Sequence, residues 1–260
     1  MDYSYSYITE STFTPSVQWH FFKLRAVPCQ NEFQQVVAQQ LDVTPPCILG
    51  QSVDGQGNAL QWGSFDAPHD VFRIVSAGIM RQVAPYALHE APAPYYLAST
   101  PLTSCTEDMQ ALAQGTLPGA TAFARAEALM HVVHSHVAYT PCHTTTATTA
   151  AQVWADPYGV CQDYAHALLA LCRAAGLHAR YVNGFIQGEG QTHAWVEVSD
   201  GAVWLPFDPT HDVRPEWGYI KIAHGRDADD CPTNRGRFYG WTSERMSVAV
   251  QVSLQNITTQ

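Results

Sequence analysis

A change in hydrophobic period in the second half of the chain is the feature that most restricts its fold. From Cys161 onward, apolar residues recur at three- and four-residue steps, as one face of an α-helix requires. They are Ala165, Leu168, Leu169, Cys172 and Ala175. Gly176 follows, where a left-handed C-terminal cap is expected. Residues 179–186, 193–198 and 203–208 then read as strands, and a helix followed by strands predicts an α+β region.

The chain before Cys161 divides into a strand-rich part and a helical part. Short aromatic and β-branched runs fill the first hundred residues and indicate an antiparallel β-sandwich. The clearest are 3–9, 17–25, 33–37, 59–62 and 71–75. A proline-rich passage runs from Pro85 to Pro101, and helical patterns follow at 106–113, 120–133 and 150–155. We therefore expect an N-terminal β-domain over residues 1–100 and a second domain over 101–260, which ends in a half-buried strand at 246–254.

Composition limits the partners and the compartment. The 260-residue chain has a formal net charge of −10 with only 13 Lys and Arg, so a nucleic-acid or anionic-membrane surface is not expected. Seven cysteines are an odd number and form no CxxC pair, which favours reduced thiols. The N-terminus lacks a signal-peptide pattern, and no apolar run approaches eighteen residues. These features predict a soluble, cytoplasmic protein; the sequence leaves its oligomeric state open.

Cys161 is the candidate nucleophile. Its predicted place in the first turn of a helix puts it beside unpaired backbone N–H groups and the positive end of the helix dipole. In such settings a cysteine pKa can fall from about 8.5 to roughly 3.5–7.5, which makes the sulfur nucleophilic at neutral pH. The alternative is a small buried hydrophobic residue, the usual role of an isolated cysteine in a helix.

The strands at 193–198 and 203–208 supply two partners for that thiol. With Asp200 and Gly201 at the centre of the turn, paired residues have numbers that sum to 401, and His193 lies directly opposite Asp208. A four-residue loop from Ser199 to Ala202 is preferred over a two-residue loop, because the shorter one would place Pro206 where a backbone N–H is needed. Opposed side chains on one face are close enough for a carboxylate to hold an imidazole.

Four ordered segments and the N-terminal strands resemble the bacterial transglutaminase-like family. The segments are Gly159–His166, Gly176–Phe185, His193–Val198 and Phe207–Thr210, the last continued by Gly225–Asp230. The N-terminal strands, with Asp54 and Gly57-Asn58, are similar to the β-domain that precedes the core in this family. The resemblance implies a papain-like transglutaminase core, in which a helix carrying Cys161 packs on an antiparallel sheet. Cys161, His193 and Asp208 then match the nucleophile, the base and the orienting acid.

The resemblance leaves the reaction open, because relatives include transamidating enzymes, amide hydrolases and members without demonstrated activity. The expected function is cysteine-dependent acyl transfer on an amide bond of a protein or peptide, by hydrolysis or transamidation. The alternative is a binding or scaffold protein that keeps the fold without turnover. Backbone N–H groups at the helix start are the expected oxyanion donors. Trp154 and Tyr139 are candidates for a side-chain donor, although each is more often simple packing.

Other conspicuous residues are given structural roles, and no cofactor or metal is expected. His131, His134 and His136, with Cys142 and His143 nearby, lack a regular second ligand pair for zinc. Asp227, Asp229 and Asp230 lack the spacing of a calcium loop. A catalytic role for Asp163 or His166 is not favoured, and Arg180 is expected to be a fixed structural ion.

Overall fold

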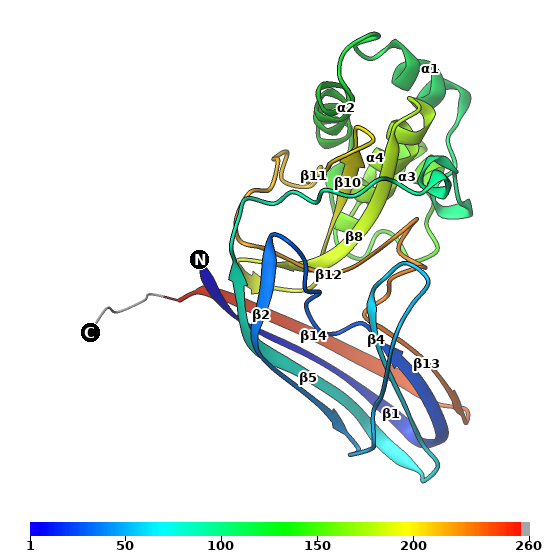
Figure 1. Cartoon of the computed structure of the whole chain (residues 1–260). Coiled ribbons are helices and arrows are strands. Elements are labelled where there is room, and N and C mark those ends of the chain that lie inside the picture. The colour runs from blue at the N-terminus through cyan, green and yellow to red at the C-terminus, as the bar shows by residue number, and fades with distance from the viewer. Residues whose placement is uncertain (256–260) are drawn as a thin grey trace.

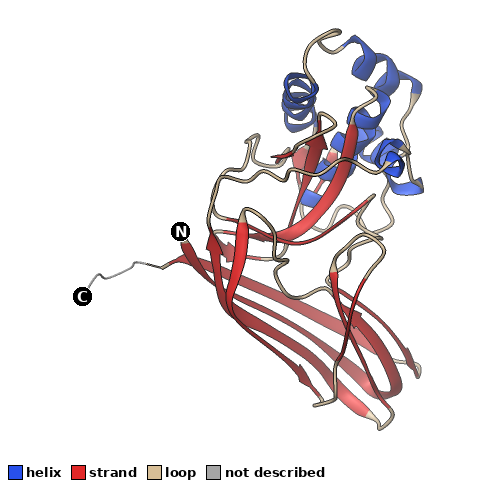
Figure 2. Ribbon diagram, in the orientation of Figure 1, coloured by secondary structure: helices blue, strands red, loops and turns tan. Residues whose placement is uncertain are grey.

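The computed structural model describes residues 1–255 and shows two parts joined along one side of a small sheet (Figure 1). Long strands make up one part, and all the α-helices gather in the other, against that small sheet (Figure 2). Within residues 1–255 no helix has the length and apolar character needed to cross a membrane. The mixed α+β class predicted from the sequence is confirmed.

The strand-rich part is organised around β1 (Asp2–Leu24), which pairs along its length with four other strands. The partners are β5 (His69–Gln82), β14 (Ser243–Leu254), β4 (Ala59–Phe65) and β13 (Asn234–Tyr239). Three further strands extend the sheet: β2 (Gln34–Thr44) on β5, β3 (Gly50–Val53) on β4 and β9 (Gly188–Gly190) on β14. Every pairing is antiparallel, as expected.

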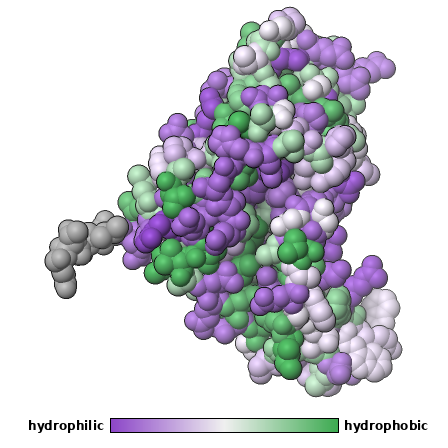
Figure 3. All heavy atoms as spheres, viewed as in Figure 1, coloured by the Kyte–Doolittle hydropathy of each residue, from purple (hydrophilic) through white to green (hydrophobic). Residues whose placement is uncertain are grey.

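The alternation of buried and half-buried side chains along β1 shows which of its faces is turned to the core. Every second side chain from Tyr3 to Phe13 is buried, which is the two-residue period of a strand with one covered face. Further along β1, Phe22 packs against Phe72 of β5 and Phe65 of β4, with ring centroids 4.8 and 5.3 Å apart. The strands at the two ends of β1 therefore pack face to face, as in a sandwich. Hydrophobic residues also reach the surface of this part among mainly hydrophilic ones (Figure 3).

The second part is a four-stranded antiparallel sheet covered by helices. The strand order is β11 (Trp204–Phe207), β10 (His193–Ser199), β8 (His178–Ile186), β12 (Tyr219–Gly225). The helices are α1 (Glu107–Gly115), α2 (Ala122–His136), α3 (Ala150–Ala155) and α4 (Cys161–Ala174), with short 3-10 helices η1 (Pro94–Leu97) and η2 (Pro101–Thr103) before them. Two-residue strands β6 (Ala138–Tyr139) and β7 (Tyr158–Gly159) pair in parallel just before α4. The strand β12 was not predicted from the sequence.

The strands at the C-terminal end return to the first part of the chain. β14 pairs with β1 over twelve residues, from Thr14 opposite Ser243 to Tyr3 opposite Leu254. β13 also pairs with β1. The predicted second domain, 101–260, therefore contains three strands, β9, β13 and β14, that belong to the sheet of the first hundred residues. The division of the chain near residue 100 itself stays a prediction.

A glycine inside a strand often marks a β-bulge, but Gly184 lies in β8 for a different structural reason. The pairing of β8 with β10 is regular at Gly184, and the irregularity lies in β12, between Lys221 and Ala223. A Cβ atom at Gly184 would lie 2.2 Å from the backbone oxygen of Ile220. Glycine is required there because the backbone of β12 approaches it too closely for a side chain.

Candidate active site

The first turn of α4 places Cys161 at the edge of a cavity and is held by a local cap. The Asp163 carboxylate accepts hydrogen bonds from the Val160 backbone N–H at 2.8 Å and the Thr144 hydroxyl at 2.6 Å. Gly159 allows this, since a Cβ there would lie 2.6 Å from Asp163 Oδ2. Burial raises the pKa of Asp163, and these hydrogen bonds oppose that change. Asp163 is therefore a capping residue, and Cys161 stays half-buried with a free thiol.

The hairpin of β10 and β11 has a register two residues away from the predicted one. Val196 lies opposite Phe207 and Ser199 opposite Trp204, so paired numbers sum to 403 and not to 401. The loop runs from Asp200 to Val203 and not from Ser199 to Ala202. The Asp200 carboxylate fixes this loop, because it accepts the backbone N–H groups of Ala202 and Val203, both at 3.0 Å.

The predicted direct opposition of His193 and Asp208 is therefore wrong, but the predicted contact between them is present. A shift of two residues preserves the face on which each side chain lies, whereas a shift of one would reverse it. Asp208 directly follows β11, and the His193 Nε2–H donates to its Oδ2 at 2.8 Å. His193 is 7% exposed and Asp208 is fully buried. The imidazole is thus diagonal to the carboxylate and shielded from water.

The electrostatics of this pair favour a charged imidazolium. Burial by itself lowers the pKa of His193, but hydrogen bonds with Asp208 and Cys161 and the two negative charges raise it to about 9. Burial would raise the pKa of Asp208, yet the hydrogen bonds from His193 and His211 hold it well below its usual range. The structure therefore brings together Cys161, His193 and Asp208, the three residues expected from the sequence. His193 lies between the other two and contacts both.

Two further side chains hold Asp208, and the sequence analysis missed both. His211 Nδ1–H donates to Asp208 Oδ2 at 2.7 Å, and the Tyr219 hydroxyl donates to the same oxygen at 2.7 Å. His211 is close to Phe207–Thr210 in the chain and could have been suspected from that position. Tyr219 begins β12, which had not been predicted, so no local pattern pointed to it.

A cavity of about 840 Å³ opens in front of the thiol and the imidazole. Cys161, Gln162, His193 and His211 contribute to its wall, together with the 186–192 segment that contains β9. Its walls also include Tyr139 and Cys142. Cys161 and His193 both lie on its wall, whereas the fully buried Asp208 does not.

The structure gives different surroundings to Tyr139 and Trp154, the two candidates for a side-chain oxyanion donor. Tyr139 lines the cavity that holds Cys161. The Trp154 indole N–H instead donates to Asp108 Oδ2 at 3.0 Å, and its ring stacks on His136 at 4.0 Å between centroids. Trp154 is therefore a packing residue, whereas Tyr139 shares the cavity wall with Cys161.

Most of the remaining histidines have their own hydrogen-bond partners. His131 contacts Asp212, His134 the Pro209 carbonyl, His136 the Trp154 carbonyl and His143 Asp156. Within residues 1–255, one group of three has ligand atoms within 4.8 Å of one another, namely His193, Asp208 and His211. Direct hydrogen bonds between these side chains already account for that closeness without an ion.

Comparison with known proteins defines the class. Residues 110–209 match the transglutaminase-like superfamily, and residues 3–81 match the bacterial transglutaminase-like N-terminal region. Together the two matches cover the helix of Cys161, His193, Asp208 and most of the strand-rich part. The chain belongs to the bacterial transglutaminase-like family.

Particular relatives fit this assignment. An uncharacterized protein of Mycobacterium tuberculosis is 28% identical over 289 residues, covering 97% of this chain and 92% of that protein. One from Mycobacterium leprae is 24% identical over 274 residues and covers 96% of each. A stretch of 71 residues, 22% of this chain, is 39% identical to 11% of a protein-glutamine gamma-glutamyltransferase of Pseudomonas aeruginosa.

A solved structure supports the whole arrangement of the fold. The crystal structure of a protein from Cytophaga hutchinsonii, described as a candidate cysteine protease, superimposes with a TM-score of 0.76 at 22% identity. The match covers 99% of this chain and 92% of that one. The order of β-rich part, helices and small sheet is thus shared with a protein of known structure.

Proposed function

We propose that the protein is a cysteine-dependent acyl-transfer enzyme that acts on an amide bond of a protein or peptide. The observation that supports this most is the chain of contacts from buried Asp208 through His193 to Cys161 at the wall of an open cavity. A nucleophile, a base and a group that orients the base are the parts of a thiol acyl-transfer site.

The geometry gives each residue a role in the first half of the reaction. Cys161 attacks the amide carbonyl carbon as the thiolate, with protonated His193 beside the sulfur. Backbone N–H groups at the start of α4, beside Cys161, receive the oxyanion. The C–N bond then breaks, His193 gives its proton to the departing amine, and the acyl group remains on sulfur.

The second half regenerates the thiolate. Water or a primary amine attacks the thioester carbonyl, and His193 accepts the proton that the nucleophile loses. The C–S bond breaks and Cys161 leaves as a thiolate beside the new imidazolium. Water gives hydrolysis and an amine gives transamidation, and the same three residues serve both. Asp208 keeps its charge throughout and stabilises the imidazolium.

The alternative function is a binding or scaffold protein without turnover. A buried carboxylate that holds an imidazole beside an accessible thiol gives no binding protein an evident advantage. Burying an ionised carboxylate has a free-energy cost, which the surrounding hydrogen bonds must offset. This arrangement favours the enzyme.

Selective alkylation followed by peptide mapping tests the proposal. Cys142 is an internal control, because it is exposed and lines the same cavity but has no partner like His193. We expect iodoacetamide at pH 6 to label Cys161 faster than Cys142, and the His193→Gln variant to lose that preference. Equal labelling of the two cysteines in the wild-type protein would favour the scaffold.

Product analysis then separates the two reactions. The wild-type protein is incubated with a glutamine-containing peptide, with and without a primary amine, and the products are identified by mass spectrometry. Cys161→Ala should abolish turnover and leave the unfolding curve almost unchanged, because the half-buried thiol contributes little volume. Turnover that survives in the folded Cys161→Ala variant would contradict the mechanism.

A further inference from the structure

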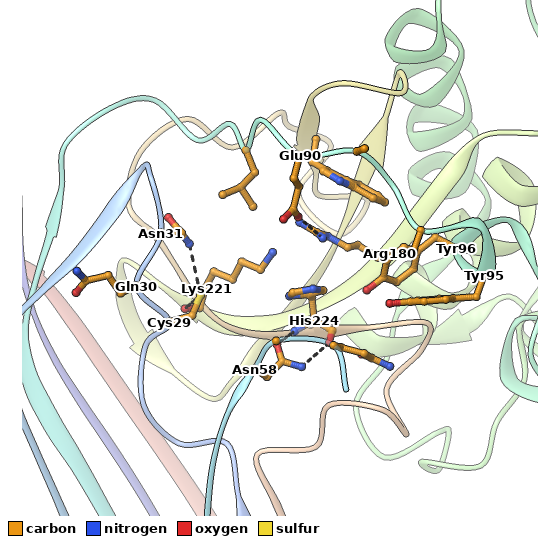
Figure 4. Close-up of a pocket in the computed structure, with 16 residues that line it drawn as sticks. Cys29, Gln30, Asn31, Asn58, Glu90, Tyr95, Tyr96, Arg180, Lys221 and His224 are labelled. Carbon is orange, nitrogen blue, oxygen red and sulfur yellow. Dashed lines mark hydrogen bonds and ion pairs between the residues drawn. The ribbon is translucent and has the colours of Figure 1, made fainter. Parts of the chain in front are cut away.

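A second cavity, of about 290 Å³, lies between the two parts of the molecule, away from Cys161 (Figure 4). Its wall comes from three places: residues 29–31 and 56–58 of the strand-rich part, residues 88–96 before the helices, and the four-stranded sheet. Side chains alternate across that sheet. Ala179 and Tyr181 pack with α4, whereas Val182 and Trp204 pack with the linker residue Leu88 on the other face. The cavity lies on this second face.

Two buried cations form part of the cavity wall. Arg180 and Lys221 are each 2% exposed, and both line the cavity. They share the buried carboxylate of Glu197: Lys221 Nζ lies 2.8 Å from both of its oxygens, and Arg180 Nε donates to one of them. One carboxylate therefore faces two cations. Buried charges are retained in proteins when they are paired, so one more negative charge is needed here.

Glu90 supplies that charge from the surface. Its Oε1 lies 2.5 Å from Arg180 Nη1, but the Glu90 side chain is 51% exposed while that of Arg180 is 3% exposed. Glu90 belongs to the linker between β5 and α1 and reaches Arg180 from there, as Figure 4 shows. A half-exposed glutamate on a linker is held weakly, since exposed ion pairs contribute little to stability. The Glu90 carboxylate thus marks an anion position that another carboxylate can occupy.

Further groups around the cavity favour a ligand with acceptor oxygens. Arg180 Nη2 and Trp204 Nε1 are buried and have no hydrogen-bond partner within the described part of the chain. Such donors are rare in native proteins and are usually satisfied by water or a ligand. The Trp204 ring lies under the Arg180 guanidinium, 4.1 Å from its Cζ, and Tyr95 and Tyr96 add an aromatic side to the wall. The site thus combines a cationic end with apolar surface.

We infer that this cavity binds a small organic carboxylate, which replaces Glu90 on Arg180 and lays its apolar part against Tyr95 and Tyr96. Because Glu197 and Glu90 together neutralise the two cations, release of Glu90 leaves room for a single negative charge. A carboxylate therefore fits better than a phosphate dianion. The volume equals that of roughly ten water molecules at about 30 Å³ each, which suits a ligand of about ten non-hydrogen atoms. This inference is independent of the proposed catalytic function.

Calorimetric titration of the whole chain with three probes tests the inference. Benzoate carries the carboxylate, benzamide is its neutral counterpart of the same shape, and inorganic phosphate is the competing anion. We expect benzoate to bind, and benzamide and phosphate to bind at least about tenfold more weakly, the difference that one hydrogen bond to a charged group supports. Preference for phosphate, or equal binding of benzamide, would overturn the assignment of a carboxylate.

Three variants locate the binding. Glu90→Gln removes the competing charge and should tighten benzoate binding by about two- to fivefold, the range of an exposed ion pair. Glu32→Gln is the matched control: Glu32 pairs with His89 at the surface, outside the cavity wall, and its loss should leave binding unchanged. Ala93→Phe fills the cavity and should abolish binding, while Cys161 alkylation confirms that the variant is folded.

Two results would contradict the inference that benzoate binds in this second cavity. One is the absence of benzoate binding in both the wild-type protein and Glu90→Gln. The other is binding that persists in Ala93→Phe and is lost in His211→Ala, because that pattern places benzoate in the cavity of Cys161. If Ala93→Phe does not fold, Ala91→Trp at the exposed rim of the same cavity gives the equivalent measurement.

Discussion

Asp208 is the residue on which the geometry of the candidate site depends. Its Oδ2 accepts hydrogen bonds from His193, His211 and Tyr219, and its Oδ1 accepts the backbone N–H groups of Thr210 and His211. A fully buried carboxylate with this many donors stays ionised and fixed in orientation. His193 is therefore fixed through Asp208, and Asp208 through a loop and a strand that lie beyond it in the chain.

Asp208→Asn should show how much of the role of Asp208 comes from its negative charge and how much from orienting His193. The variant keeps the shape of the side chain but loses the negative charge that stabilises the imidazolium. We expect turnover to fall between about 10-fold and the roughly 10⁴-fold loss known for the same change in a serine triad. The pKa of His193, followed by NMR, should fall at the same time.

His211→Asn serves as the control for that change. It removes one donor to Asp208 from a side chain that is 47% exposed, and it leaves the charge in place. We expect a smaller loss of turnover than in Asp208→Asn. If both variants lost turnover equally while the pKa of His193 stayed unchanged, Asp208 would have no electrostatic role.

The stability of the protein should depend on pH through His193. Its pKa is raised from 6.5 in the unfolded chain to about 9 in the folded protein, so the folded state binds the proton more tightly. The resulting stabilisation is fully present below about pH 6.5 and is lost as the pH rises through 9. At 1.36 kcal/mol per pKa unit, it amounts to about 3–4 kcal/mol. Urea unfolding of the wild-type protein and of His193→Gln between pH 6 and 10 checks this. A difference between the two curves that does not change with pH would contradict it.

At the scale of elements, the four-stranded sheet carries the site because α4 and β10 are packed together. The face of β10 with Ala194, Val196 and Val198 is buried in the core shared with α4, which brings the start of the helix to the start of the strand. The opposite face carries His193 and Glu197, so one strand contributes to the cavity of Cys161 and to the charge cluster of Arg180 and Lys221. β12 lies on the far side of β8 and carries Tyr219, which holds Asp208, and Lys221, which pairs with Glu197. Its position is therefore important to both sites.

Gly184→Ala tests how tightly β8 and β12 are packed. The added Cβ meets the backbone of Ile220 at 2.2 Å and the Trp195 ring at 2.5 Å, and a backbone atom cannot move aside as a flexible side chain can. We expect a loss of about 1–3 kcal/mol in the free energy of unfolding, the usual cost of overpacking. Gly115→Ala is the control, because a Cβ there meets nothing within 4 Å at the end of α1. That control should be neutral or slightly stabilising. Equal stability of the two variants would mean that β12 can move away from β8.

At the scale of the whole molecule, the two parts share one core. Tyr5 and Tyr7 of β1 pack on Phe185 of β8, with ring centroids 6.0 and 5.3 Å apart. β14 lies between β1 and β9, and β9 contributes to the wall of the cavity of Cys161. The strand-rich part therefore contacts the small sheet through β1 at one end of the chain, and the cavity wall through β14 at the other end.

Unfolding should consequently involve both parts in one transition. Val252→Asp puts an unpaired charge at a position that is 2% exposed, between Tyr5 of β1 and Gly188 of β9. Because an uncompensated buried charge typically costs about 3–5 kcal/mol, we expect a large shift of the urea midpoint. Tryptophan fluorescence and the loss of selective Cys161 alkylation should report the same midpoint. Ser253→Asp, on the exposed side of the same strand, should leave the midpoint unchanged. Separate midpoints for the two probes would show that the parts unfold independently.

Much of the fold and the three main site residues could be predicted from the sequence, because their signals are local. The apolar stripe after Cys161, the alternation at Tyr3 to Phe13 and the run of strands after Gly176 each follow from the period of a single element. The contact of His193 with Asp208 was also predictable, since it depends only on which face each residue takes. An error of two residues in register does not alter that face.

Tertiary structure alone decided the contacts between elements that are distant in the chain. The pairing of β14 with β1 joins the two ends of the sequence, and the residues of neither strand indicate the other as its partner. Tyr219 reaches Asp208, and Glu90 reaches Arg180, because separate loops lead back to the same sheet. Hydrophobic period depends on neighbours three or four residues away, whereas these contacts depend on how whole elements pack. The sequence by itself therefore determined the elements and the faces that bring Cys161, His193 and Asp208 together, and the packing determined how Asp208 is held and where the second cavity forms.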